Sequence, residues 1–154
     1  MIESYKEALE SFKRVDHLYH VSLKYTRTVD VIRSVVERII STYEHSVASL
    51  LRCVKEEKII EDIPDNPVGK ALLVQEKCGS VEEVKALDLY LTLRKLMRMP
   101  YSGREEFRRH VTMIVQKEGE EILIDIDLLY EYYLLTAHFL SYVKTRVEPY
   151  KDRE

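Results

Sequence analysis

The sequence is poor in residues that interrupt helices or form disulfides. Its 154 residues include four glycines, four prolines, two cysteines and no tryptophan. Cys53 and Cys78 lack the CxxC spacing of zinc knuckles and thioredoxin-like redox motifs, so neither a metal site nor a disulfide framework is predicted. We therefore expect two buried thiols.

Membrane-spanning and targeting segments are missing as well. No stretch approaches the roughly 18 apolar residues that a membrane span requires. The amino-terminal stretch MIESYKEALE is acidic and amphipathic, whereas a signal peptide begins with a basic segment that an apolar one follows. We therefore expect a cytoplasmic protein with no membrane partner.

The sequence also lacks the short motifs of several common enzyme classes. P-loop, dinucleotide-binding and Gly-x-Ser-x-Gly patterns are all absent. Their absence argues against nucleotide hydrolysis at a Walker site, Rossmann-type redox chemistry and α/β-hydrolase chemistry. We therefore expect no cofactor.

Charged residues, by contrast, are abundant. They make up 33% of the chain, against about 25% in an average domain, while asparagine occurs once and glutamine twice. This profile is typical of proteins from thermophiles. The formal net charge of −3 argues against binding of bulk nucleic acid or anionic membrane, but it leaves room for a local basic patch.

Apolar residues recur at intervals of three and four along most of the chain, which predicts amphipathic helices. Thr28 is expected to cap the second helix, Ser80 and Glu83 have the spacing of a capping box, and Asp127 is expected to cap the last helix. The predicted helices cover residues 2–24, about 28–54, 70–77, about 80–98 and 127–148.

The apolar period changes to two between the last two of these helices. Alternation on both sides of a Gly119 turn predicts a β-hairpin over about 110–126. The stretch 100–103 is expected to interrupt regular secondary structure. The segment 104–110 fits either a helical turn or an extension of the strand. The predicted fold is mainly α, an antiparallel four- to five-helix bundle with a small inserted β-hairpin. A single domain is expected over 1–147, followed by a charged C-terminal tail over 148–154.

A basic segment precedes the hairpin and is the first candidate for chemistry. Arg104 and His110 are separated by five residues, and Arg108 and Arg109 lie between them. An arginine can hold a phosphate by two hydrogen bonds, and a histidine can move a proton near neutral pH. We therefore take Arg104 and His110 as candidate catalytic residues, and Arg108, Arg109 and Tyr101 as candidate RNA- or phosphate-binding residues. The alternative interpretation is a solvated basic turn.

A helical bundle of this length with Arg104 and His110 near the start of a late segment resembles the HEPN superfamily. Many members of that superfamily are ribonucleases or RNA-binding toxin components. The resemblance covers most of the chain at the level of architecture. It implies a dimer with a shared cleft, in which His110 assists attack by a 2′-hydroxyl and Arg104 holds the phosphate.

Two further groups of polar residues are candidate sites. His17 and His20 could face one metal ion on the first helix, with ligands added from the last helix by Asp127, Glu131 and His138. Asp125 and Asp127 could act as a carboxylate pair. We favour surface, helix-capping and hairpin-edge roles for these residues, so no metal site is predicted.

Tyrosine is the dominant aromatic residue, with eleven copies against three of phenylalanine. Tyr130, Tyr132 and Tyr133 lie around the last helix and cannot all point into one core. Tyrosine is common at partly solvated surfaces such as subunit interfaces. These tyrosines therefore favour a helical interaction or assembly module that forms a homodimer or binds a protein partner. The alternative function is a HEPN-like, metal-independent ribonuclease or RNA-binding protein that uses Arg104 and His110.

Overall fold

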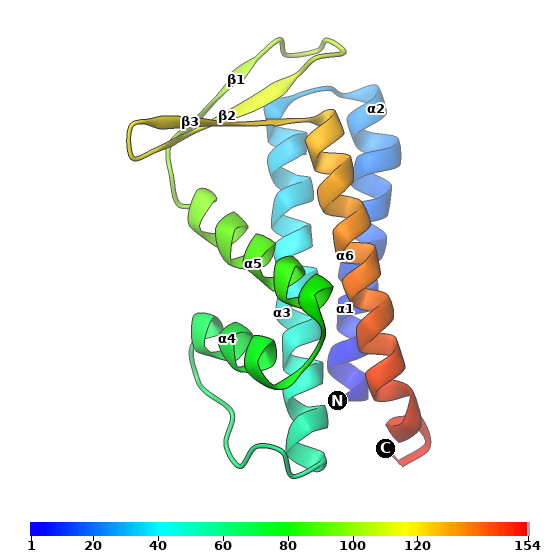
Figure 1. Cartoon of the computed structure of the whole chain (residues 1–154). Coiled ribbons are helices and arrows are strands. Elements are labelled where there is room, and N and C mark those ends of the chain that lie inside the picture. The colour runs from blue at the N-terminus through cyan, green and yellow to red at the C-terminus, as the bar shows by residue number, and fades with distance from the viewer. Residues whose placement is uncertain (154) are drawn as a thin grey trace.

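The computed structural model describes residues 1–153 and is mainly helical, with one small antiparallel sheet (Figure 1). This confirms the predicted mainly α fold with a small β element. Three long helices run lengthwise, two shorter helices pack at an angle beside them, and the sheet lies at one end. The helical elements are α1 (Ile2–His17), the π-helical turn η1 (Leu18–Ser22), α2 (Leu23–Tyr25), α3 (Val29–Glu56), α4 (Pro67–Lys77), α5 (Val81–Leu96), α6 (Ile126–Val147) and the 3₁₀ segment η2 (Glu148–Arg153).

Helix α3 supplies the centre of the core. The Thr28 Oγ1 atom accepts a hydrogen bond of 3.3 Å from the Val31 N–H, so the predicted N-cap is confirmed. The Tyr43 ring is fully buried between Tyr90 of α5 and Phe139 of α6, at centroid distances of 5.7 and 5.2 Å. Helices α1, α4, α5 and α6 all pack against α3 and bury its apolar side chains.

The N-terminal cap of α5 was predicted from the sequence, whereas that of α4 was not. Glu83 accepts a hydrogen bond of 2.8 Å from the Ser80 N–H and a second one from the Ser80 hydroxyl, which confirms the capping box. Helix α4 begins three residues earlier than predicted, because Asn66 caps it and Pro67 suits the first helical position. Cys53 and Cys78 are both buried and free, as expected.

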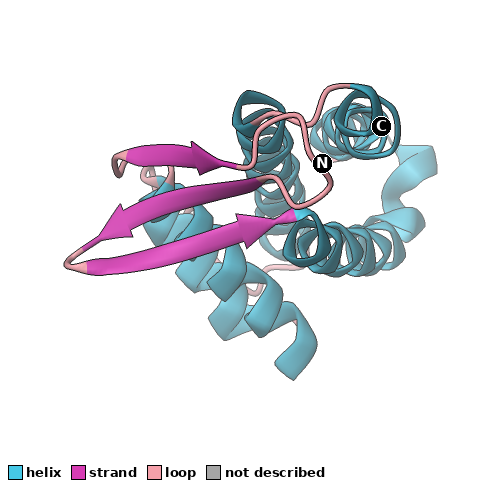
Figure 2. Ribbon diagram, turned by 90° about the horizontal axis from the view of Figure 1, so that it is seen from above, coloured by secondary structure: helices cyan, strands magenta, loops and turns pink. Residues whose placement is uncertain are grey.

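The β element is larger than the predicted hairpin. Strands β1 (Tyr101–Arg104), β2 (Thr112–Lys117) and β3 (Glu120–Asp125) form an antiparallel sheet in the order β1-β2-β3. Viewed from above in Figure 2, the three strands lie side by side and extend beyond the helices. The predicted interruption of secondary structure over 100–103 is therefore wrong, because residues 101–103 belong to strand β1. A Cβ atom on Gly103 would lie only 2.5 Å from a Val29 methyl group, so glycine permits the close approach of β1 to the start of α3.

The segment over 105–111 is neither the predicted helical turn nor a strand extension. Glu105 and Phe107 adopt positive φ angles of 55° and 65°, which turn the chain sharply between β1 and β2. The Phe107 N–H donates to the Arg27 carbonyl oxygen at 2.6 Å, and the Val29 N–H donates to Glu106 Oε2 at 3.2 Å. The turn is thus fastened to the connection between α2 and α3.

The last helix starts one residue earlier than predicted and ends at Val147, where a 3₁₀ segment follows it. Asp125, and not Asp127, caps α6 by accepting a hydrogen bond of 2.8 Å from the Leu128 N–H, because β3 passes directly into the helix. Of the predicted tail over 148–154, residues 148–153 form η2, where the Tyr150 hydroxyl donates to Glu57 at 2.9 Å. Residue 154 lies outside the described residues. None of the described helices is long and apolar enough to span a membrane.

Candidate functional site

The predicted catalytic and phosphate-binding residues lie at the sheet end of the molecule. Arg104 is the last residue of β1 and pairs with Thr112 of β2. Arg108, Arg109 and His110 lie in the exposed turn that follows. Residues paired across antiparallel strands share a face, so Arg104 and Thr112 lie on the same side of the sheet. The turn therefore brings the basic residues to one edge of the fold.

A small pocket of about 260 Å³ opens at this edge, and His110 and Arg109 both line it. Arg104 is a strand neighbour of the lining residue Thr112 and does not itself line the pocket, and neither does Arg108. The other lining residues are Arg27, Ile126, Asp125 and Asp127. The structure thus places His110 beside Arg109 and Arg27, with Arg104 one strand away.

Tyr101 lies apart from this pocket. It is separated from Arg104 by an odd number of positions along β1, so the two side chains point to opposite faces of the sheet. The Arg33 guanidinium lies over the Tyr101 ring, 4.4 Å from its centroid. Tyr101 therefore contacts α3 and does not join the residues around His110.

Arg27 is a pocket residue that sequence reasoning missed. It lies in the short connection between α2 and α3, more than eighty positions from His110, and the hydrogen bond between Phe107 and its carbonyl oxygen brings the two segments together. No local motif marks it. Opposite these cations, Asp125 is engaged as the α6 cap, whereas Asp127 makes no ion pair within the described part of the chain.

Two exposed aromatic residues lie close to the pocket residue Arg27, Tyr25 two positions before it and Phe107 through the hydrogen bond to its carbonyl oxygen. Tyr25 at the end of α2 and Phe107 in the turn are 81% and 76% exposed, more than any other large apolar side chain in the described residues. Arg27, Arg104, Arg108 and Arg109 make no ion pair with any described residue. We call this surface the arginine–aromatic end, and define it by Tyr25, Phe107, Arg27, Arg104, Arg108, Arg109 and His110.

The candidate metal ligands do not lie together, and each has different neighbours. His20 Nε2 lies 3.6 Å from Asp16, and His138 Nε2 lies 2.7 Å from Glu82 on α5. Asp127 lines the pocket at the sheet end. No group of three or more His, Cys, Asp or Glu side chains among the described residues is arranged to hold a metal ion. The structure does not bring His17, His20 and the α6 residues into one site.

A tyrosine cluster joins α6 to η1, the turn that follows α1. The Tyr130, Tyr133 and Tyr19 rings lie 5.5–5.9 Å apart between centroids. The Tyr133 hydroxyl donates to Asp16 at 2.6 Å, and burial together with the hydrogen bond to Asp16 and its negative charge raises the pKa of Tyr133 to about 12. Tyr132 takes no part in these ring contacts and, like Tyr19 and Tyr133, is partly buried against the core. We call Tyr19, Tyr130, Tyr133 and the half-exposed Leu134 the tyrosine face.

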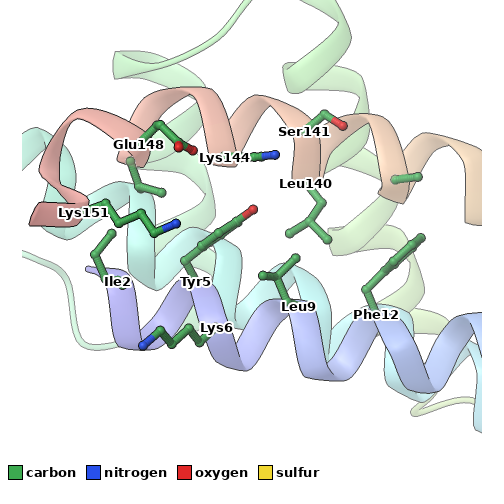
Figure 3. Close-up of a pocket in the computed structure, with 12 residues that line it drawn as sticks. Ile2, Tyr5, Lys6, Leu9, Phe12, Leu140, Ser141, Lys144, Glu148 and Lys151 are labelled. Carbon is green, nitrogen blue, oxygen red and sulfur yellow. The ribbon is translucent and has the colours of Figure 1, made fainter.

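A groove lies along helices α1 and α6, closer to the chain ends. This α1–α6 groove encloses about 590 Å³ and is lined mainly by apolar side chains, with Lys6, Lys144, Lys151 and Glu148 at its rim (Figure 3). No residue of the groove belongs to the predicted sites.

Comparison with known proteins found no matching family model, no matching curated protein and no matching solved structure.

Proposed function

We propose that this protein binds single-stranded RNA at the arginine–aromatic end. The observation that supports this most directly is the position of Tyr25 and Phe107, which are exposed beside arginines that make no ion pair with any described residue. Bases of a single strand stack on exposed aromatic rings, and guanidinium groups hold the phosphates between them. The overall charge of −3 restricts this binding to one local surface.

RNA cleavage without a metal is the extended form of this proposal, and it is the activity that the HEPN-like resemblance implies. His110 shares its pocket with Arg109 and Arg27, so a phosphate held by either arginine lies within reach of an imidazole. Arg104 contributes positive charge from the neighbouring strand. Asp127, in the same pocket, opposes an anionic substrate. The geometry therefore supports binding more strongly than cleavage.

Fluorescence anisotropy with a labelled single-stranded RNA of mixed sequence, in EDTA and low salt, tests the binding proposal. Phe107→Ala is expected to weaken binding by about 1–3 kcal/mol, the loss of one stacked base. Arg108→Gln is expected to lower the salt dependence by about one unit of slope. Leu72→Ala, which removes an exposed apolar side chain from α4, is the matched control. Equal affinities for wild type and Phe107→Ala would contradict the proposal.

Gel analysis of the same RNA separates cleavage from binding. A ribonuclease would cut the RNA in EDTA and lose that activity in His110→Ala, with RNA affinity retained. Absence of cleavage by the pure wild-type protein would leave an RNA-binding module.

A second candidate function is assembly of two such helical bundles into a homodimer through the tyrosine face. The observation that favours the tyrosine face is the positive charge of the other two candidate surfaces. Two-fold contact places the same patch on both subunits, so the arginine–aromatic end and the lysine rim of the α1–α6 groove would each face their own like charges. The ring contacts among Tyr19, Tyr130 and Tyr133 involve no lysine or arginine, and Tyr130 and Leu134 are 41% and 48% exposed. Lys85 of α5 is a cation that lies beside this face, next to Leu134.

Sedimentation velocity at micromolar concentration tests this second function. A dimer that dissociates in Tyr130→Asp, but not in the control Leu72→Asp, is expected. A wild-type monomer would contradict assembly through this face.

A further inference from the structure

The α1–α6 groove has the size and lining of a small-molecule site. Its volume of about 590 Å³ lies within the range of about 300–1,000 Å³ typical of ligand pockets. Figure 3 shows Tyr5, Leu9 and Phe12 of α1 opposite Leu140 of α6. From Ile2 to Phe12 the lining extends over ten positions, which corresponds to about 15 Å along a helix. The groove is therefore about 15 Å long.

Charge is distributed unevenly along this groove. The amino-terminal end of α1 and the carboxyl-terminal end of α6 lie at the same end of the molecule (Figure 1), so the lysines of both segments gather there. They are Lys6, Lys144 and Lys151, and none of them makes an ion pair with a described residue. Glu148 lies at the same end, which leaves a net charge of +2 from three lysines and one glutamate.

The opposite end of the groove contains no charged side chain among its lining residues. Leu9 and Phe12 face Ala137 and Leu140 there. Near the lysines, Tyr5 provides a hydroxyl donor, and burial together with the Glu148 carboxylate raises its pKa, so the hydroxyl keeps its proton. Figure 3 shows the Lys151 side chain extending toward Tyr5. A cationic, hydrogen-bonding end is thus followed by an apolar channel.

We propose that the α1–α6 groove binds one long-chain carboxylate, with its carboxylate group at Lys144, Lys151 and Tyr5 and its chain between Leu9 and Leu140. The charge at one end matches the head group, and the apolar remainder matches a single alkyl chain. A second copy of this chain fits less well, because two-fold contact would place lysine rims against each other. The site is separate from the arginine–aromatic end and does not depend on RNA binding.

Calorimetric titration of the full chain with dodecanoate, below its critical micelle concentration, tests the proposal. Saturable binding of one dodecanoate per chain is expected, with a higher melting midpoint in its presence. Dodecyltrimethylammonium, which has the same alkyl chain and the opposite charge, is expected to bind far more weakly. Decanoate, shorter by two methylenes, is expected to bind about tenfold more weakly than dodecanoate.

Two variants distinguish the two ends of the site. Charge reversal in the double variant Lys144→Glu/Lys151→Glu is expected to weaken dodecanoate binding about tenfold. Lys85→Glu/Lys95→Glu on α5 is the control of equal charge change and is expected to bind like wild type. Ala137→Trp is expected to abolish binding of dodecanoate by filling the apolar end, while a wild-type melting midpoint without ligand shows that the variant folds.

Three results would overturn the proposal. They are absence of saturable dodecanoate binding, equal binding of the cationic amphiphile, and an equal loss of affinity in the two double-lysine variants. A dimer that dissociates in Ala137→Trp would identify the groove as a contact between copies of the chain.

Discussion

Replacing Glu83 by glutamine tests the capping box that fixes the start of α5. Glu83 is a buried residue, and its carboxylate accepts hydrogen bonds from the Ser80 backbone N–H, at 2.8 Å, and from the Ser80 hydroxyl. Hydrogen bonds to a charged group contribute about 1.5–3 kcal/mol, against about 0.5–1.5 kcal/mol between neutral groups. Glutamine keeps one acceptor and loses the charge. The expected cost is therefore about 1 kcal/mol, or about 2–4 °C in melting midpoint for a chain of this size.

The dependence of this cost on pH gives the sharper test. Burial raises the pKa of Glu83, but the hydrogen bonds from the Ser80 hydroxyl and backbone outweigh it and hold the pKa below its ordinary value. A carboxyl group whose pKa is lower in the folded state stabilises the fold above its unfolded pKa of about 4.3 and loses that contribution as pH falls through the folded pKa. The difference between wild type and Glu83→Gln should thus be constant from about pH 7 to about pH 5 and shrink as the pH falls below about 4.3.

Urea unfolding across this pH range measures the effect, and Glu82→Gln provides the control. The Glu82 side chain is 66% exposed and pairs with His138 at 2.7 Å, so its replacement should cost less than about 0.5 kcal/mol at pH 7. A Glu83→Gln cost that stays constant as pH falls, or that equals the control, would refute the reasoning.

Three other predictions concern the sheet end and overall stability. Asp125→Ala should destabilise the fold by about 1 kcal/mol in urea unfolding, and Asp127→Ala by less, and the reverse order would contradict the observed cap. Gly103→Ala should lower the melting midpoint, because the added Cβ atom would lie 2.5 Å from a Val29 methyl group, and an unchanged midpoint would show that β1 can move away from α3. The abundance of charge and scarcity of amides predict a melting midpoint above the mesophile range of about 45–65 °C, which calorimetry can check.

Periodicity and capping residues predicted most helices well because both are local properties. The caps at Thr28 and at Ser80 with Glu83 follow from side chains that bond to the backbone three positions away. Strand β1 escaped prediction because its evidence is not local. Only the pairing with β2 and the close approach of Gly103 to α3 explain why Tyr101–Arg104 is extended.

The candidate site could be predicted in part for the same reason. Arg109 and His110 are adjacent in sequence and share the pocket. Arg27 comes from a distant connection, and Tyr25 lies at the end of a helix where an aromatic residue suggests burial. Their place in the site depends on the docking of the turn over 105–111, which no sequence pattern reveals.

The contact between Phe107 and Arg27 also links ligand binding to the stability of the whole chain. Arg27 lies between α2 and α3, while the turn that holds Phe107 lies between β1 and β2, so the two are adjacent only in the folded state. An unfolded chain cannot present both to one ligand. A ligand held by both segments at about 100 times its dissociation constant would therefore stabilise the fold by about 2.7 kcal/mol. Thermal unfolding can thus reveal ligands of this surface before their chemistry is known.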